Sequence, residues 1–384
     1  MTRPAVALFL GASSMFATMY STQAILPELE SGLGCSAAAA GLSITVVVFA
    51  VAIFGWLYGP LSDRAGRVRV MVGSAAAIVV PTALLAVAPG LPAFLALRAA
   101  QGALMPGLLV VAVPYVAERF RGPGQGAAMG AYTGSLVFGG LVGRVGTAVV
   151  AGQIGWRGAL AALTVLPATG AVAMWAWLPR DRPHAAVWPS RAEILDHLHN
   201  RRLLANAACA GSSFFAFVGV FTYATHRLTG APFRLSLTES GLVYSVWLVG
   251  ALLPAMGGIA DRVGPARLLP AFVACGAAGG LLTLADLLPV VMLGLAMMAL
   301  GMFSTVTACQ LLIPRIASHN RGTATSLHLT VYYLLGGLGA YLPGLALSAG
   351  WGDVIAVCLA ASAVALLLAG LLAARLPAQR PALG

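Results

Sequence analysis

Two arginines stand inside stretches that otherwise carry no charge, and a positive charge in such a place needs a chemical reason. Arg98 lies six residues into an apolar stretch at 92–117, and Arg144 lies eight residues before Gly152 in another stretch, at 127–151. If these stretches cross a bilayer, a rise of 1.5 Å per residue puts the two side chains about 9 and about 12 Å deep. A charge at the bilayer centre costs about 2.5–3.5 kcal/mol on insertion scales, so both should face protein or water.

Two interpretations stay open for each arginine. Either it attracts an anionic or carbonyl-rich substrate, or it is tied to backbone carbonyls and to neighbours such as Gln101, holding two glycine-rich helices together. Neither Arg98 nor Arg144 has an obvious acidic counter-ion in its own stretch. Arginine stays charged at any usable pH, so neither can carry a transported proton itself.

Proton transfer would need a group that titrates near neutral pH. His328, five residues into a stretch at 323–348, is the only deep histidine and a candidate carrier. A lone histidine inside a membrane is more often a hydrogen-bonded packing residue, so that interpretation stays open beside the first. Glu28 and Glu239, at the outer ends of the first and eighth predicted helices, are fallback carriers.

The composition tells us which elements must hold these residues. Sixty per cent of the 384 residues are hydrophobic and 9% are charged, which is too little charge to cover a soluble protein of this length. The chain is therefore predicted to be an all-α integral membrane protein, because about 20 apolar residues span a hydrocarbon core. The sequence predicts twelve such helices, at 5–26, 40–59, 70–89, 92–117, 127–151, 158–178, 203–225, 240–260, 268–288, 290–313, 323–348 and 352–374.

The basic residues, all of them arginine, set the predicted orientation. Most lie at the termini or in loops after even-numbered helices, whereas loops after odd-numbered helices hold only Arg157, Arg227 and Arg234. Because basic loops stay in the cytoplasm, both termini should be cytoplasmic, in the inner membrane of a bacterium. The net charge of +11 then needs no nucleic-acid partner.

A charged linker at 179–202 divides the chain into halves at 1–178 and 203–384. Ser190 and Glu193 have capping-box spacing, which predicts a short amphipathic helix over 191–202. Its apolar residues should lie against the membrane surface and its polar residues outward: Ile194, Leu195 and Leu198, and His197, His199 and Arg201 respectively. A plain linker and a regulatory element are both compatible with this pattern.

The halves repeat. Gly59, Asp63, Arg64 and Gly66 recur as Gly257, Asp261, Arg262 and Gly264, and Pro114, Tyr132 and Gly139 recur as Pro314, Tyr332 and Gly339. Parallel six-helix repeats related by an axis along the membrane normal are a known transporter layout. The sequence therefore predicts two parallel-repeat six-helix bundles.

The stretch from Gly59 to Arg69, predicted as a tight loop at the membrane surface, resembles the signature loop of the major facilitator superfamily. The resemblance covers nearly the whole chain and includes an R-x-x-Q-G motif from Arg98 to Gly102. Tyr20–Gln23, Gly139–Arg144 and Tyr332–Leu334 are similar to the YnfM-type, arabinose-efflux-permease-like branch of drug and sugar exporters. The fifth helix departs from many exporters of the family because it lacks the Gly-Pro pair of the antiporter motif.

The resemblance implies alternating access, with an inner gate built from charged residues of both halves. Asp63 should cap the eleventh helix near Thr323, and Glu118 should pair with Arg67. The gate residues that it implies are Asp63, Arg64, Arg67, Glu118, Arg121, Asp261, Arg262 and Arg321.

The substrate is expected between the halves, in an aromatic-lined cavity with few charges, which suits a lipophilic or amphipathic solute. For any one aromatic residue, a position facing lipid or a neighbouring helix fits as well. The candidate binding residues are Tyr20, Gln23, Arg98, Gln101, Arg144, Phe217, Tyr223, Tyr244, Trp247, Gln310, His328 and Tyr332.

Other chemistries lack the residues they require. No phosphate-binding glycine loop, H-E-x-x-H or G-x-S-x-G pattern occurs, and the five cysteines show no metal-binding spacing. We therefore expect a monomeric secondary transporter with no cofactor and no metal, not an enzyme or an ATP-driven pump. Proton-coupled efflux of a small organic solute is favoured, with protons implied by the resemblance. The alternative is uptake or facilitated passage of a small organic anion through Arg98 and Arg144.

Overall fold

A computed structural model describes residues 2–120, 123–181, 188–252, 256, 259, 263–317 and 319–375. The described regular elements are all helical, as the composition predicts. The chain divides into two compact units, which we describe separately: unit 1 holds Met1–Trp188 and Thr225–Leu248, and unit 2 holds Pro189–Ala224 and Val249–Gly384. The predicted division at the 179–202 linker stays a prediction.

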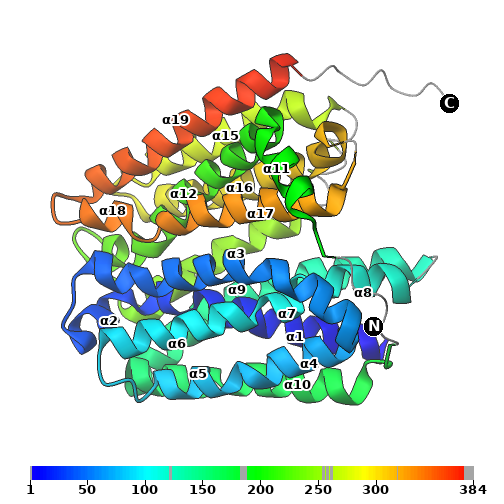
Figure 1. Ribbon diagram of the computed structural model, residues 1–384. Helices are drawn as coiled ribbons and strands as arrows, with labels where there is room; N and C mark the ends of the chain where they lie inside the picture. The colour runs from blue at the N-terminus through cyan, green and yellow to red at the C-terminus, as the bar shows by residue number, and fades with distance from the viewer. Residues whose placement is uncertain are drawn as a thin grey trace. The chain divides into compact units, whose positions relative to one another are not determined.

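Unit 1 is a bundle of long helices that run side by side (Figure 1). Helix α1 packs against α9 and α10, and α3 packs against α6. The elements of this part of the chain are α1 (Arg3–Tyr20), η1 (Ser21–Ile25), α2 (Leu26–Leu33), α3 (Ala37–Ala65), α4 (Arg67–Ala77), α5 (Val79–Leu85), α6 (Leu91–Leu104), α7 (Pro106–Leu109), α8 (Ala112–Arg119), α9 (Pro123–Leu163), α10 (Val165–Trp177), α13 (Leu237–Val243) and η2 (Tyr244–Leu252), the last of which continues beyond Leu248.

Unit 2 is also helical, and in it α15 packs between α16 and α19 (Figure 1). Its elements are α11 (Arg191–His199), α12 (Arg201–Thr229, whose last turn belongs to unit 1), α15 (Pro265–Leu282), α16 (Leu288–Ile316), α17 (Arg321–Leu338), α18 (Leu342–Leu345) and α19 (Trp351–Arg375).

The described residues contain nine helical stretches long and apolar enough to cross a membrane. One of them, at 132–177, holds two of the predicted spans, because the chain turns at Gly155, where φ is 76°. Helices α13 and α17 begin the predicted eighth and eleventh spans. The described helices are thus consistent with the twelve expected from the sequence.

The first predicted helix is not continuous. It ends as α-helix at Tyr20, passes through the buried 3₁₀ turn Ser21–Ile25 and resumes at Leu26. Pro27 accounts for the change, because proline has no N–H to donate to the carbonyl of Gln23 four residues earlier. That carbonyl instead accepts a hydrogen bond of 3.3 Å from the Thr225 hydroxyl.

The prediction of a loop over 59–69 is wrong. Helix α3 continues through Pro60 to Ala65, and α4 begins at Arg67, so that only Gly66 departs from helical geometry. Gly66 has φ of 92°, a conformation that side chains with a Cβ rarely adopt. The charged signature is therefore a helix corner.

Helix α1 approaches α9 so closely that no methyl group fits between them. A Cβ on Gly139 would lie 2.2 Å from the carbonyl oxygen of Ser13, and one on Gly143 would lie 2.3 Å from that of Ala17. Small residues allow such close packing where helices lack a hydrophobic driving force between them. These two glycines fix the side of α9 that faces α1.

The linker helix α11 begins with the predicted capping box, in which Ser190 and Glu193 bond each other's backbone N–H groups. The predicted outward position of His197 is wrong, because its side chain is buried and its Nε2 lies 3.3 Å from the carbonyl oxygen of Asn320. Leu195 and Leu198, which are predicted to lie against the membrane surface, have exposed side chains.

Candidate functional site

The most unusual polar group in unit 1 is the guanidinium of Arg144, which lies on α9 and is fully buried. Its Nε donates to Oε1 of Gln23 at 2.8 Å, and its Nη1 donates to the carbonyl oxygen of Gly140 at 2.8 Å. The 3₁₀ turn η1 positions Gln23 for this contact. Gly140 leaves room for the side chain, since a Cβ there would lie 3.1 Å from Nη1 of Arg144.

Three aromatic rings surround the same guanidinium. Its central carbon lies 4.3 Å from the ring centroid of Tyr20, 4.0 Å from that of Trp247 and 5.9 Å from that of Tyr244. Cation–π attraction offsets part of the cost of burying the charge. No carboxylate of the described residues pairs with Arg144, which agrees with the missing counter-ion in its sequence.

One nitrogen of Arg144 is left over. Its Nη2 is buried and has no hydrogen-bond partner among the described residues. A buried donor without an acceptor has lost its hydrogen bonds to water and has gained none to protein, so buried polar groups in native structures are seldom left in this state. The arrangement can receive an oxygen atom from a bound molecule.

A hydroxyl chain closes the site beside Gln23. The Thr225 hydroxyl donates to the Gln23 carbonyl, and the hydroxyls of Thr225 and Tyr244 lie 2.9 Å apart. Because a threonine has a single hydroxyl proton, Tyr244 must be the donor in the second bond. These hydrogen bonds hold Tyr244 and the backbone of Gln23 in place beside Arg144.

Arg98 has a different environment. Its side chain is fully buried on α6, and all three nitrogens have partners. Nε donates to Ser43 O, Nη1 to Thr18 O and to Gln101 Oε1, and Nη2 to Met19 O, at 2.7–2.9 Å. Gln101 in turn donates to the Thr82 hydroxyl at 2.8 Å. Arg98 therefore ties α6 to α1 and α3.

Unit 1 also holds the outer acidic candidates. Glu239 is the capping-box partner of Ser236 at the start of α13, and hydrogen bonds from the Ser236 backbone and hydroxyl lower its pKa below the usual value. Glu28 lies half-buried in the first turn of α2. Sequence reasoning missed a third group, the ion pair of Glu30 and His226, because the two residues lie far apart in the chain.

At the α3–α4 corner, the expected pair of Arg67 and Glu118 is present. Both oxygens of the Glu118 carboxylate accept from Arg67, at 2.6 and 2.8 Å, and Asp63 lies 3.2 Å from the same guanidinium. The carboxylate of Asp181 accepts from the backbone N–H groups of Arg67 and Val68, which caps α4. The sequence offered no signal for that cap, since Asp181 lies in the linker.

The remaining gate candidates are less informative. Arg64 in unit 1 and Arg321 at the start of α17 in unit 2 have exposed side chains. Arg121, Asp261 and Arg262 lie outside the described residues.

In unit 2 the candidate aromatic residues form a buried cluster. The rings of Phe217 and Phe221 are 4.3 Å apart, and Phe214 stacks on Tyr332 at 4.5 Å. Tyr223 donates to the carbonyl oxygen of Ala340 at 2.6 Å. Gln310 is exposed.

His328 is buried in unit 2 beside Asn206. The Asn206 amide approaches Nδ1 of His328 at 3.4 Å and donates to the Cys309 carbonyl at 2.9 Å. An amide nitrogen is a donor, so Nδ1 accepts and the ring proton is on Nε2. This Nε2 is buried with no partner among the described residues.

Comparison with known proteins decides the family. The family model of the major facilitator superfamily matches residues 8–340. The chain belongs to the major facilitator superfamily. It is therefore a multi-pass secondary transporter of small molecules and belongs to a family of transporters, not of enzymes.

Curated relatives in this superfamily are similar over most of their length. The MFS-type transporter YybF of Bacillus subtilis is 27% identical over 96% of this chain and 92% of its own. The inner membrane transport protein YnfM of Escherichia coli is 30% identical over 68% of this chain and 64% of its own. A chloramphenicol resistance protein of Pseudomonas aeruginosa is 24% identical, over 82% and 76%.

Solved structures share the fold at low identity. A bacterial homologue of the human lysosomal transporter Spinster, inward-facing and occupied, superposes with a TM-score of 0.76 at 17% identity, over 97% of this chain and 96% of its own. A D-xylose–proton symporter gives 0.71 at 15% identity, over 96% of each chain. The all-helical, twelve-helix fold class expected from the sequence is confirmed.

Proposed function

We propose that this transporter exports a small organic solute that combines an apolar or aromatic body with an anionic or carbonyl oxygen. The observation that carries the proposal is Nη2 of Arg144, a buried donor without a partner among the described residues. A solute oxygen at Nη2 would supply the missing acceptor in a charge-assisted hydrogen bond.

The walls of the Arg144 site support an amphipathic solute. Tyr20 and Trp247 cover the guanidinium with their rings, and Tyr244 stands nearby. Flat aromatic surfaces favour contact with an apolar or aromatic body, and Arg144 with Gln23 supplies the few polar groups that orient a ligand in such a site. We assign Arg98 the role of positioning α6 against α1 and α3. Each of its three guanidinium nitrogens already donates to a protein oxygen, so none is left to bind the solute.

Export and proton coupling rest on resemblance and on two named relatives. One relative is named a chloramphenicol resistance protein, which supports export, and a D-xylose–proton symporter shares this fold, which supports proton coupling. His328 is the proton carrier proposed for unit 2, because it is a buried imidazole; uptake of a proton at Nδ1 requires the Asn206 amide to turn its oxygen toward the ring. Glu28 and the Glu30–His226 pair are outer alternatives. Glu239 is the weaker candidate because its capping bonds favour the ionised form.

The corner of Asp63, Arg67 and Glu118 is proposed as part of the inner gate of a monomer in a bacterial inner membrane, with both termini cytoplasmic. Its bidentate Arg67–Glu118 pair holds α4 to α8, and Asp63 shares the same guanidinium. A carboxylate that shares its partner can exchange it for another at low cost, as alternating access requires.

The second candidate function is uptake or facilitated passage of a small organic anion. The same nitrogen of Arg144 favours it, since the described part of the chain places neither a hydrogen-bond partner at Nη2 nor a carboxylate beside that cation. The two candidates differ in direction and in coupling and share the binding residue.

Transport into inside-out vesicles tests both. Three solutes on one ring skeleton would be compared, an aromatic carboxylate, its neutral amide and its amine, with and without an imposed pH gradient. Export predicts accumulation of the carboxylate and the amide, driven by an acidic vesicle interior, and exclusion of the amine. Passage without response to the gradient would favour the facilitator, and preference for the amine would overturn the proposed site.

A further inference from the structure

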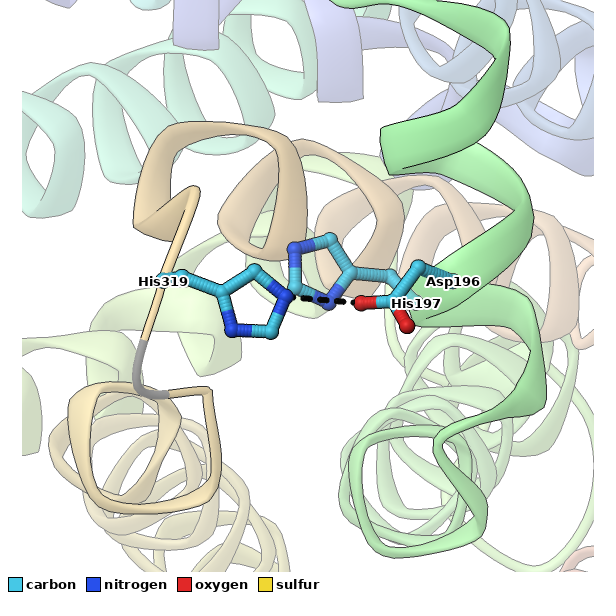
Figure 2. Close-up of side chains that lie close together, drawn as sticks. All are labelled: Asp196, His197 and His319. Carbon is cyan, nitrogen blue, oxygen red and sulfur yellow. Dashed lines mark hydrogen bonds and ion pairs between the residues drawn. The ribbon is translucent and has the colours of Figure 1, made fainter.

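Three potential metal ligands meet at one point on unit 2. Asp196 and His197 lie on α11, and His319 lies in the connection between α16 and α17 (Figure 2). One ligand atom from each residue lies within 4.8 Å of the others. His319 lies more than a hundred residues after Asp196 and His197 in the sequence. The cluster therefore could not be predicted from the spacing of metal-binding residues.

The two outer ligands are already neighbours. Nε2 of His319 lies 2.8 Å from Oδ2 of Asp196 (Figure 2), and both side chains are more than half exposed. In a tetrahedral zinc site with bonds of about 2.0–2.1 Å, adjacent ligand atoms are about 3.3 Å apart. The existing separation is therefore close to that of two ligands on one ion.

His197 supplies the third donor and is buried. Its Nε2 lies 3.3 Å from the carbonyl oxygen of Asn320, a residue with φ of 45°. When Nε2–H donates to that carbonyl, the lone pair of the ring is on Nδ1. A histidine whose second nitrogen donates to a backbone carbonyl is the arrangement that orients metal-bound imidazoles.

We propose that Asp196, His197 and His319 form a binding site for a divalent transition-metal ion, zinc being the best match. Two imidazoles and one carboxylate suit zinc, whereas magnesium and calcium prefer oxygen ligands alone. The proton that His319 shares with Asp196 leaves to solvent when the ion binds, since ligating nitrogens must be unprotonated. The three ligand atoms, which all lie within 4.8 Å of one another, reach bonding distance of one ion by rotation of the exposed side chains, and water completes the fourth position.

The bound ion would fasten α11 to the connection before α17. This junction already contains the His197–Asn320 contact and a hydrogen bond of 3.4 Å from Asn200 to the Ile316 carbonyl. Helix α11 belongs to the predicted linker between the two repeats and packs within unit 2. The ion would therefore hold this part of the linker more rigidly against the rest of unit 2. The site is independent of the Arg144 proposal and makes no use of the transported solute.

Zinc binding to the purified, tag-free transporter in lipid nanodiscs tests the site, by competition with a chromophoric chelator. We expect one zinc per chain, with affinity lowered at least about tenfold in each of Asp196→Asn and His319→Gln. His199→Gln is the matched control, because His199 lies on the same helix and bonds the Leu195 carbonyl of that helix; the zinc affinity of this variant should be unchanged.

Cobalt gives a second reading on the same variants. Two imidazoles and a carboxylate around cobalt should produce the intense visible absorption of a four-coordinate ion, and His319→Gln should abolish it. The test uses the exposed residues because His197→Gln could unfold α11. Equal zinc affinity in the wild type and His319→Gln, or no saturable binding at one per chain, would overturn the proposal.

Discussion

Arg144 lies over the indole of Trp247, with its guanidinium carbon 4.0 Å from the ring centroid. The ring of Tyr20 is 4.3 Å from the same carbon, and the two ring centroids are 6.1 Å apart, so the rings cover adjacent sides of the charge. These two rings and the hydrogen bonds to Gln23 and to the Gly140 carbonyl limit the rotation of the guanidinium, and so they restrict the direction in which Nη2 can donate. The solute must meet Nη2 in that direction, and the predictions for binding follow from it.

Arg144→Gln should weaken binding of the aromatic carboxylate at least about tenfold, since a charge-assisted hydrogen bond contributes about 1.5–3 kcal/mol. Arg144→Lys should recover little of the loss, because an ammonium cannot bond Gln23 and the Gly140 carbonyl while presenting a planar donor. Equilibrium binding of a labelled solute measures both. Wild-type affinity in Arg144→Gln would remove this residue from the binding site.

Trp247→Leu should weaken solute binding by about threefold to thirtyfold, since loss of a cation–π contact of about 0.7–2 kcal/mol frees the guanidinium to turn. Trp175→Leu is the control, because Trp175 on α10 is 72% exposed and belongs to the same unit. Equal effects of the two substitutions would mean that the ring acts through general destabilisation.

Arg98→Ala should reduce the stability of the folded transporter by about 3–5 kcal/mol, because it strands buried carbonyls and the Gln101 side chain without a donor. Thermal unfolding in detergent measures this loss. Arg157 bonds the carbonyls of Ala86 and Ala88 from a more exposed position, so Arg157→Ala should cost far less. If Arg98→Ala were stable but no longer bound solute, the structural role would be contradicted and Arg98 would belong to the solute-binding residues.

Asp63→Asn should leave the transporter folded and able to bind solute while turnover slows several-fold. The companion Glu118→Gln removes the bidentate partner of Arg67 and should lower stability instead. Binding, unfolding temperature and transport rate separate the two effects. If both variants lost only stability, Asp63 would have no gating role.

Glu239 gives a prediction for pH. Its pKa is lowered in the folded protein by the Ser236 hydrogen bonds, so its contribution to stability is present above the unfolded pKa of about 4.3 and disappears as pH falls through the lowered value. The wild type should therefore unfold at a slightly higher temperature than Glu239→Gln at pH 7, and the gap should close once the pH has fallen below the lowered pKa of Glu239. A gap that widened on acidification would contradict the capping role.

The sequence predicted the helical class, the capping box at Ser190 and the pairing of Arg67 with Glu118, because those depend on local spacing, composition or motif. It also placed Gln23 and Arg144 among the candidate binding residues. It did not predict the 3₁₀ turn at Ser21–Ile25, for which Pro27 was the available signal.

Contacts across long sequence separations account for the other differences. Asp181 caps a helix more than a hundred residues earlier, and Glu30 meets His226 from another helix. His197 turns inward because the Asn320 carbonyl offers a partner, a fact that the helical pattern of α11 does not contain. Nor could periodicity show that all three nitrogens of Arg98 have partners, while Nη2 of Arg144 has none within the described ranges.

The contact of α1 with α9 at Gly139 and Gly143 limits how transport can occur. A Cβ at either glycine would lie less than 2.5 Å from a carbonyl oxygen of α1. If α9 slid along α1, neighbouring residues that have a Cβ would be brought against these carbonyls and would clash. Tyr20 and Arg144 must then move together as parts of one rigid block. Paired spin labels on α1 and α9 should report the same separation with and without solute, so this helix pair can serve as an internal ruler for motion elsewhere in the transporter.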